Sequence, residues 1–184
     1  MKYGNALALA LSVLITGPCL LHAESGSFVL AVKKTGTDVS KIPDSVGHIA
    51  RDQSMTIQIN VRNLAKTNAS VRVHWYFIAK KSDTGDSIIF DQGEKAFDLK
   101  PSASTNEIVK SGMLHMNAPE HINPRLDAKM DGYLVVGTDA AGNSRCEATR
   151  TPLKDLVKTA LAFEALKKRT QAWKDAGGNS IVQE

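Results

Sequence analysis

The chain has 184 residues, 42% of them hydrophobic, with a formal net charge of +4 and two cysteines. This length supports one domain with room for an appendage, and such a domain can bury a core without disulfides or a metal ion. The basic residues are spread along the chain instead of forming a basic stripe with interleaved aromatic residues, which argues against a nucleic-acid partner.

The first segment has the organisation of a secretory signal peptide. Lys2 precedes an apolar run over residues 6–15, and Leu21-His22-Ala23 leads into the polar Glu24. We predict a signal peptide over residues 1–23 and an exported mature chain that resides in the periplasm, the outer membrane or at the cell surface. A membrane anchor is the alternative, but the run is shorter than the roughly 20 residues of a spanning helix.

The two cysteines have different expected roles. Cys19 lies in the leader, where a lipoprotein site is an alternative, but Pro18 before it is not the small residue that lipidation sites favour. Cys146 is then the single cysteine of the mature chain, to be buried, modified or used for dimerisation. We expect it to be buried, because a cysteine thiol packs as a small hydrophobe.

The segment after the leader is predicted to form β-strands. A first strand covers residues 27–34, and residues 35–54 are expected to be irregular. Residues 55–63 and 71–79 have apolar side chains at every second position, which predicts two central strands with one buried face each. Further short strands are expected at residues 87–92, 95–99, 105–110, 132–138 and 144–149. The absence of a helical pattern between these strands predicts an antiparallel sandwich.

Two aromatic positions narrow the fold to an immunoglobulin-like β-sandwich over residues 24–150. Trp75 lies on the second central strand, where that fold has its core tryptophan, and Tyr133 begins a late strand, as in a tyrosine corner. Val135 would take the place of the second core cysteine, and Ile59 or Val61 that of the first. Aliphatic packing would thus replace the disulfide, and the fold class is all-β.

The end of the chain is predicted to be one long amphipathic helix over residues 151–177, followed by a flexible tail over 178–184. Pro152 suits a first helical position, and apolar side chains recur at helical spacing from Leu153 to Trp173. The apolar pattern, from residue 151 to residue 173, would make about 35 Å of helix at 1.5 Å per residue. Either it packs along its own sheet, or the part beyond Leu166 projects to meet a partner.

A candidate interaction surface follows from the outer row of the second central strand and from the end of the helix. It consists of His74, Tyr76, Ile78, Lys167, Lys168, Arg169 and Trp173. The strand residues have the mixed aromatic and aliphatic character of a recognition face. Since the helix needs an apolar landing site, we also expect it to cover part of this row.

We assign no catalytic, cofactor-binding or metal-binding residue. The chain has no nucleophile elbow, His-Glu-x-x-His motif or glycine-rich phosphate loop. His115, Glu120 and His121 could be drawn as a metal site, but their spacing matches no compact ligand motif. Residues 83–86 could offer oxygens to Ca²⁺, but a turn is the preferred interpretation.

Residues 55–81, and residues 131–139 continuing to 151–156, resemble small exported immunoglobulin-like proteins of verrucomicrobial bacteria such as Akkermansia. The resemblance covers about half of the mature chain and rests on a strand pattern and on an ending of tyrosine strand, hairpin and helix. Some such proteins are associated with type IV pilus-like systems and the outer membrane, which implies a structural role at the surface or in the periplasm. The chain departs from pilins, because no long apolar N-terminal helix follows Glu24, and no functional residue can be carried over.

These features favour a non-catalytic exported binding or structural module of the bacterial cell envelope, and the resemblance suggests a link to a pilus-like surface assembly. Its expected partner is a protein or glycan of the cell surface, or a second copy of the chain. One alternative is a metal-dependent enzyme built around His115, Glu120 and His121. Another is an export chaperone or inhibitor that acts by edge-strand donation.

Overall fold

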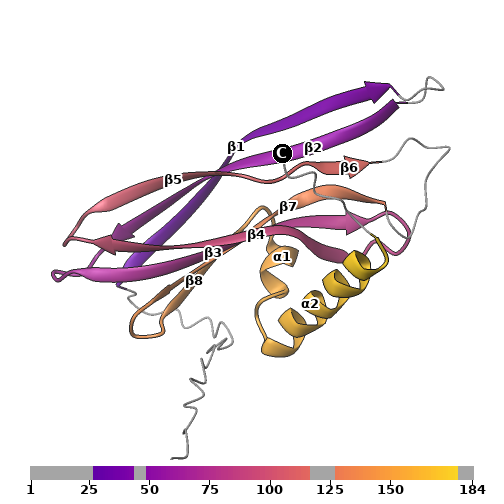
Figure 1. Cartoon of the computed structure of the whole chain (residues 1–184). Coiled ribbons are helices and arrows are strands. Elements are labelled where there is room, and N and C mark those ends of the chain that lie inside the picture. The colour runs from indigo at the N-terminus through magenta and orange to yellow at the C-terminus, as the bar shows by residue number, and fades with distance from the viewer. Residues whose placement is uncertain (1–26, 44–48, 117–126, 178–184) are drawn as a thin grey trace, which may run out of the picture.

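The computed structural model describes residues 27–43, 49–116 and 127–177 as two packed β-sheets with two helices on one side (Figure 1). The predicted signal peptide and the predicted tail lie outside these residues. The elements, in chain order, are β1 (Phe28–Pro43), β2 (Ile49–Asn63), β3 (Ala69–Lys81), β4 (Ser87–Leu99), β5 (Ser104–Lys110), β6 (Leu114–Met116), β7 (Ala128–Asp139), β8 (Ser144–Ala148), α1 (Thr151–Asp155) and α2 (Ala160–Asp175).

Each sheet contains four strands, and all strand pairs are antiparallel. The first sheet has the order β1-β2-β5, with β6 pairing with β2, and the second has the order β4-β3-β7-β8. The chain therefore crosses between the sheets after β2, after β4 and after β6. This arrangement confirms the predicted all-β sandwich.

The inner faces of the two sheets form the main core, which is built from the predicted alternating residues. Ile59, Val61 and Val135 are fully buried, so aliphatic side chains do occupy the places where a disulfide could have joined the sheets. The prediction that Tyr133 forms a tyrosine corner was wrong. The Tyr133 hydroxyl donates to the carbonyl oxygen of Val32 on β1 at 3.2 Å, so it links the two sheets instead of bonding back to its own connection.

Strand β4 is a single strand where the sequence suggested two. Gly93, which falls in the gap between the expected strands 87–92 and 95–99, lies within β4 opposite Trp75 of β3. A Cβ atom at Gly93 would lie 2.5 Å from the Trp75 ring, so the indole lies directly over this glycine. The glycine therefore provides room for a cross-strand aromatic side chain and does not end the strand.

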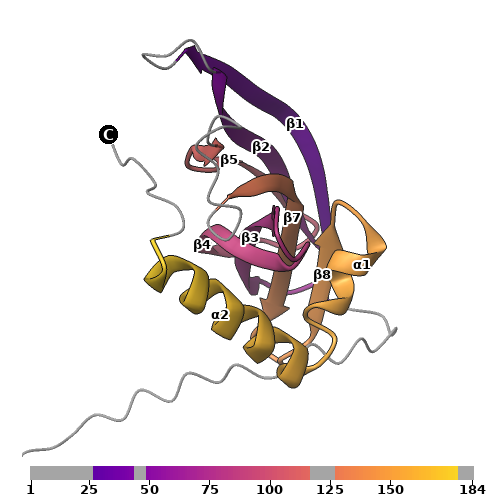
Figure 2. The same cartoon turned by 90° about the vertical axis from the view of Figure 1, so that its right-hand side faces the viewer.

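Strands β1 and β2 form a much longer hairpin than predicted, so the expectation of an irregular segment was wrong for residues 35–43 and 49–54, while residues 44–48 lie outside the described residues. The register continues from Phe28 opposite Asn63 to Pro43 opposite Ile49, with one irregularity between Lys34 and Gly36. The distal half of this hairpin extends beyond the second sheet (Figure 2). We call residues 35–43 and 49–54 the arm.

The prediction of a single C-terminal helix was also wrong, because the helical structure is interrupted between α1 and α2. Thr159 is extended, with φ −130° and ψ 147°, and its side chain accepts a hydrogen bond from the Ala162 amide at 3.1 Å. This is an N-cap, which satisfies an amide that the first turn of α2 leaves without a partner. The predicted rod of about 35 Å is thus two shorter helices that fold back over the second sheet.

Candidate interaction surface

The outer face of the second sheet is covered by the two helices. Ile78 and Leu134 of the sheet and Leu153 and Leu166 of the helices are at most 1% exposed in one cluster. The Tyr76 ring meets the Phe163 ring of α2 edge-on, with 5.4 Å between their centroids. The half-apolar row on β3 is therefore the landing site of the helices, as one of the two interpretations expected.

This packing removes several residues from the predicted interaction surface. Ile78 is 0% exposed and Trp173 is 3% exposed, with Trp173 packed in the main core. α2 does not project beyond Leu166, because its last two turns follow the edge of β4. These residues stabilise the fold and are not available to a partner in this structure.

The basic residues of α2 differ from one another in their surroundings. The Lys167 ammonium lies 4.7 Å from the Phe163 ring centroid and 2.8 Å from a Glu164 carboxylate oxygen. The Arg169 side chain is half-buried and its Nε atom is inaccessible, whereas Lys168 is exposed. Only Lys168 of these three is thus freely presented to solvent.

His74 is the predicted residue that keeps partial access at the margin of the covered face. Its Nδ1 lies 3.2 Å from a carboxylate oxygen of Glu94, and its side chain is 35% exposed. Burial lowers the pKa of His74, Glu94 acts in the opposite direction, and Arg72 adds to the lowering. His74 is therefore predominantly neutral near pH 7 and contributes little positive charge to this margin.

Helix α2 also satisfies a backbone group of the edge strand β4. The Thr170 hydroxyl accepts a hydrogen bond from the Ile89 amide at 2.9 Å and donates to the Leu166 carbonyl oxygen at 2.9 Å. The register of β4 against β3 shifts next to this point, where Phe77 pairs with Asp91 and Ile78 with Ile89. α2 therefore covers this edge strand at an irregularity that would otherwise leave a buried amide unsatisfied.

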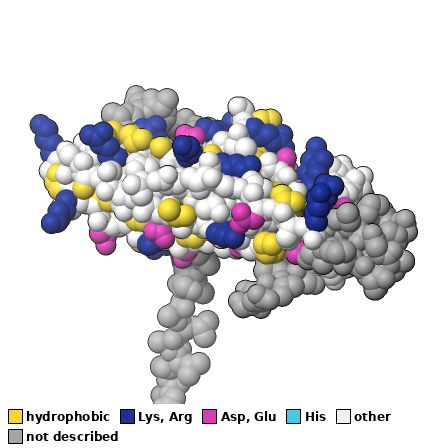
Figure 3. Space-filling model, turned by 90° about the horizontal axis from the view of Figure 1, so that it is seen from above, with side chains coloured by type: hydrophobic (Ala, Val, Ile, Leu, Met, Phe, Trp, Pro, Cys, Tyr) yellow, Lys and Arg dark blue, Asp and Glu magenta, His cyan; other side chains and the backbone are white. Residues whose placement is uncertain are grey.

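Among the described residues, no helix covers the outer face of the first sheet. Residues that alternate with the core point outward here, and Ile108 is 70% exposed and Val29 is 42% exposed. Between them the Asn60 side chain donates to the Asn106 side chain at 2.6 Å. Figure 3 shows this face: Lys and Arg side chains surround a middle that is mostly uncharged. We call the outward-facing residues of β1, β2 and β5 the open face.

An ion pair crosses one end of the open face, where β1 and β5 flank β2. The Lys110 ammonium lies 2.7 Å from an Asp38 carboxylate oxygen. The hydrogen bond and positive charge of Lys110 lower the pKa of Asp38. Both side chains are more than half exposed, so the pair is a feature of the surface and adds little to stability.

The metal site considered from the sequence is only partly described, because Glu120 and His121 lie outside the described residues. His115 lies on β6 with its Nδ1 2.5 Å from an Asp52 carboxylate oxygen. Within residues 27–43, 49–116 and 127–177 no group of three His, Cys, Asp or Glu side chains is placed to hold a metal ion.

The segment weighed as a Ca²⁺ loop forms a turn between β3 and β4. The Asp83 carboxylate accepts from the Thr84 amide at 2.7 Å and pairs with Lys81 at 3.3 Å, and Gly85 has φ +73°. The Asp83 carboxylate thus serves the local backbone and Lys81, as the preferred turn interpretation expected.

Cys146 is buried, as expected, with 9% of its surface exposed. It lies on β8 in the cluster beneath α1 and α2. A thiol in such a place packs as an apolar side chain.

The sequence interpretation missed the open face as a candidate site. The sequence did contain a signal for this face, because Gln58 and Asn60 alternate with core residues on β2 and Asn106 and Ile108 do so on β5. The alternation identifies the outward residues, but it does not indicate which of two outward faces a helix will cover.

Comparisons with known proteins identify no family for this chain. No family model and no curated protein matches it. Similar solved structures include the structural-genomics target SoR45, at 14% identity and a TM-score of 0.35, covering 70% of this chain and 85% of that one. A putative ApaA protein from Bordetella pertussis is 13% identical, with a TM-score of 0.33, and the match covers 66% of this chain and 88% of that one. A protein from Akkermansia muciniphila is 8% identical, with a TM-score of 0.24, and the match covers 71% of this chain and 76% of that one.

At these scores and identities the likenesses carry no argument about function. One of these structures is from the genus named in the resemblance noted from the sequence, and at 8% identity and a TM-score of 0.24 nothing further follows from it. Among the helices of the described residues, none combines the length and apolar character needed to cross a membrane.

Proposed function

We propose that this protein is a non-catalytic module of the bacterial cell envelope, exported and used for binding or for structure. The observation that carries the proposal is the asymmetry of the sandwich. One outer face is sealed by α1 and α2, while the other exposes apolar and polar side chains over three strands. An exposed surface of mixed apolar and polar side chains suits recognition of a macromolecule better than it suits chemistry on a small substrate.

Edge-strand donation, the second role considered above, has less support. The long edge strand of the first sheet is β1, opposite the shorter edge strand β5, and β1 contains Lys33, Lys34 and Lys41, an irregularity after Lys34, and Pro43. Lysines, bulges and proline are the features by which natural proteins prevent pairing at an edge. We therefore favour recognition through the face of the sheet over recognition through its edge.

Site-specific photocrosslinking tests the proposal. A benzoylphenylalanine at Ile108, on the open face, is compared with one at Leu161, which is 83% exposed on α2. Each variant is incubated with the envelope fraction of the source organism and irradiated. We expect a defined adduct from position 108 and none from position 161. Equal adducts from both positions, or none from position 108, would reject the open face as the binding surface.

A further inference from the structure

Methionine residues gather at the base of the arm. Of the five methionines in the chain, all except Met1 lie on β2, just before β6, on β6 or on β7. They are Met55, Met113, Met116 and Met130. β6 pairs with residues 51–53 of β2, which belong to the arm (Figure 1). Because a thioether sulfur is a soft ligand, this part of the chain offers ligands for a soft metal ion.

Three of the four methionines face the inside of the sandwich. Met55 is 4% exposed in the main core, and Met130 packs against the same core. Met116 lies on the same side of β6 as Leu114, which is 1% exposed. This is the inner side of the sheet, because Gln53, the partner of Leu114, accepts a hydrogen bond from the Met130 amide on β7 at 3.4 Å. These three side chains therefore have packing roles.

The register places the fourth methionine on the outer side of the sheet, together with His115. Leu114 points inward, so its neighbours Met113 and His115 point outward, because side chains alternate along a strand. The segment reaches this register through one extra residue. Only Ser54 separates the β2 residues that face Ser111 and Leu114, whereas two residues separate Ser111 from Leu114. Such a bulge re-aims side chains, and here it brings a thioether to the side of an imidazole.

Asp52 orients the His115 ring. Its carboxylate oxygen lies 2.5 Å from Nδ1 of His115, and an ionised carboxylate can only accept a hydrogen bond. Nδ1 is therefore the donor, and Nε2 of the neutral ring carries the lone pair. A carboxylate on one ring nitrogen is the usual support of a histidine that binds a metal through the other. The side chain of Asp52 is 17% exposed and that of His115 is 45% exposed, so the imidazole is the more accessible of the two.

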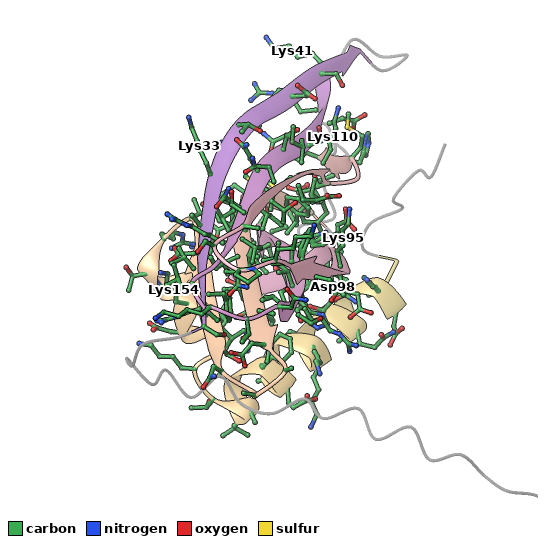
Figure 4. All side chains as sticks on the ribbon, turned by 90° about the vertical axis from the view of Figure 1, so that its left-hand side faces the viewer. Lys33, Lys41, Lys95, Asp98, Lys110 and Lys154 are labelled. Atoms are coloured by element: carbon green, nitrogen blue, oxygen red, sulfur yellow. The ribbon has the colours of Figure 1, made fainter. Side chains whose placement is uncertain are left out.

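The spacing and the charge of this place suit one small cation. Positions two residues apart on a strand are about 7 Å apart at roughly 3.3 Å per residue, so a thioether and an imidazole there can converge on one ion. The neighbouring ion pair of Asp38 with Lys110, at 2.7 Å, is neutral as a unit, and Asp52 contributes a negative charge beside the ring. Figure 4 shows Lys110 near the base of the arm and Lys41 close to its distal end.

We propose that Met113 and His115 bind a Cu(I) ion through the thioether sulfur and Nε2, with Asp52 as the positioning residue of the ring. Thioether ligands select Cu(I), whereas Zn²⁺ prefers thiolate, imidazole and carboxylate ligands. This inference goes beyond the proposed function and does not depend on it. It also needs neither of the undescribed residues Glu120 and His121.

Anaerobic titration of the purified chain with Cu(I), in competition with the coloured chelator bicinchoninate, tests the proposal. The site variants are Met113→Leu and His115→Asn. Met116→Leu is a matched control, because it removes a thioether from the inner side of the same segment. His74→Asn removes another imidazole that lies beside a carboxylate. Cys146→Ala tests the buried thiol as a competing ligand.

We expect one Cu(I) ion to bind per chain. Each site variant should lower the affinity about tenfold or more, and each control about twofold or less, because only the former remove a ligand. Asp52→Asn should lower the affinity by about 10–100-fold and change the tautomer of the His115 ring in its ¹⁵N spectrum. In the unmodified chain, Cu(I) should shift the methyl resonance of Met113 and leave that of Met116 in place.

Several results would overturn the proposal. The first is an absence of Cu(I) binding, or a Met113 methyl resonance that Cu(I) does not move. An equal loss of affinity in Met113→Leu and Met116→Leu would show that the thioether position is immaterial. A loss in His115→Asn without a loss in Met113→Leu would leave an imidazole site that needs no sulfur. A loss confined to Cys146→Ala would assign the ion to the thiol.

Discussion

The contact between Thr170 and the edge strand gives a sharp test of how the helices stabilise the fold. Thr170→Val preserves the shape of the side chain but removes the acceptor of the Ile89 amide, which lies in a position that is 3% exposed. Leaving a buried donor without a partner costs about 1–3 kcal/mol. The change in helix propensity is small, because valine and threonine rank together.

Thr170→Ser is the matched control, because it keeps the hydroxyl and removes one methyl group, worth about 0.8 kcal/mol. Urea unfolding gives the free energy of unfolding of each variant, and amide hydrogen exchange reports on Ile89 itself. The valine variant should be destabilised by about 1–3 kcal/mol and lose protection at Ile89, while the serine variant keeps that protection. A valine variant with wild-type stability and a protected Ile89 amide would refute the reasoning.

Three further predictions concern the core and the pH dependence of stability. Gly93→Ala places a Cβ atom 2.5 Å from the Trp75 ring, so it should destabilise the fold by about 1–3 kcal/mol in urea unfolding, and no loss would mean that the indole moves freely. Trp173→Ala should cost about 3–5 kcal/mol in the same assay, because the indole is 3% exposed in the main core, and a loss below about 1 kcal/mol would show that α2 is not anchored there. Burial raises the pKa of Asp139, but hydrogen bonds from Ser27 and from the following turn outweigh this effect, and the pKa is lowered. The ionised carboxylate therefore stabilises the fold at neutral pH, and this contribution is lost as pH falls below the ordinary aspartate pKa. The Tm of Asp139→Asn should fall less steeply with decreasing pH than that of the unmodified chain. An equally steep fall would contradict this assignment.

The central strands were predictable because each alternates an apolar inner row with a more polar outer row. Ile57 and Ile59 of β2 alternate with Gln58 and Asn60, and β3 has the same pattern up to Phe77. Period-two alternation arises from one-sided burial, and it was strongest where burial was most one-sided. The half-apolar outer row of β3 also indicated that α2 would cover this strand.

The arm could not be predicted from alternation because it lies beyond the second sheet. Its β1 residues from Thr37 to Lys41 are exposed whichever way they point. With solvent on both faces, a strand has no need to alternate apolar and polar side chains. Only pairing with β2 makes this segment a strand, and pairing is not visible in one sequence.

The break between the helices was hidden for the opposite reason. Apolar side chains keep helical spacing from Leu153 to Trp173, because both helices pack on the same sheet. The local signal was Thr159, an N-cap residue inside an apparently continuous pattern. Burial periodicity and capping chemistry disagreed at this position, and the capping residue marked the true boundary.

The same asymmetry that concealed the candidate site also explains how the fold can carry one. α1 and α2 place the apolar rows of β3 and β7 beneath them, so the second sheet is buried on both faces and tolerates little change. The first sheet obtains its stability from its inner face, where Ile57, Ile59 and Val61 are fully buried. Its outward residues and its arm contribute little to that core, so their side chains can vary with the partner without loss of the fold. Lys41 opposite Arg51, an arrangement that costs stability in the isolated chain, lies in this part of the molecule.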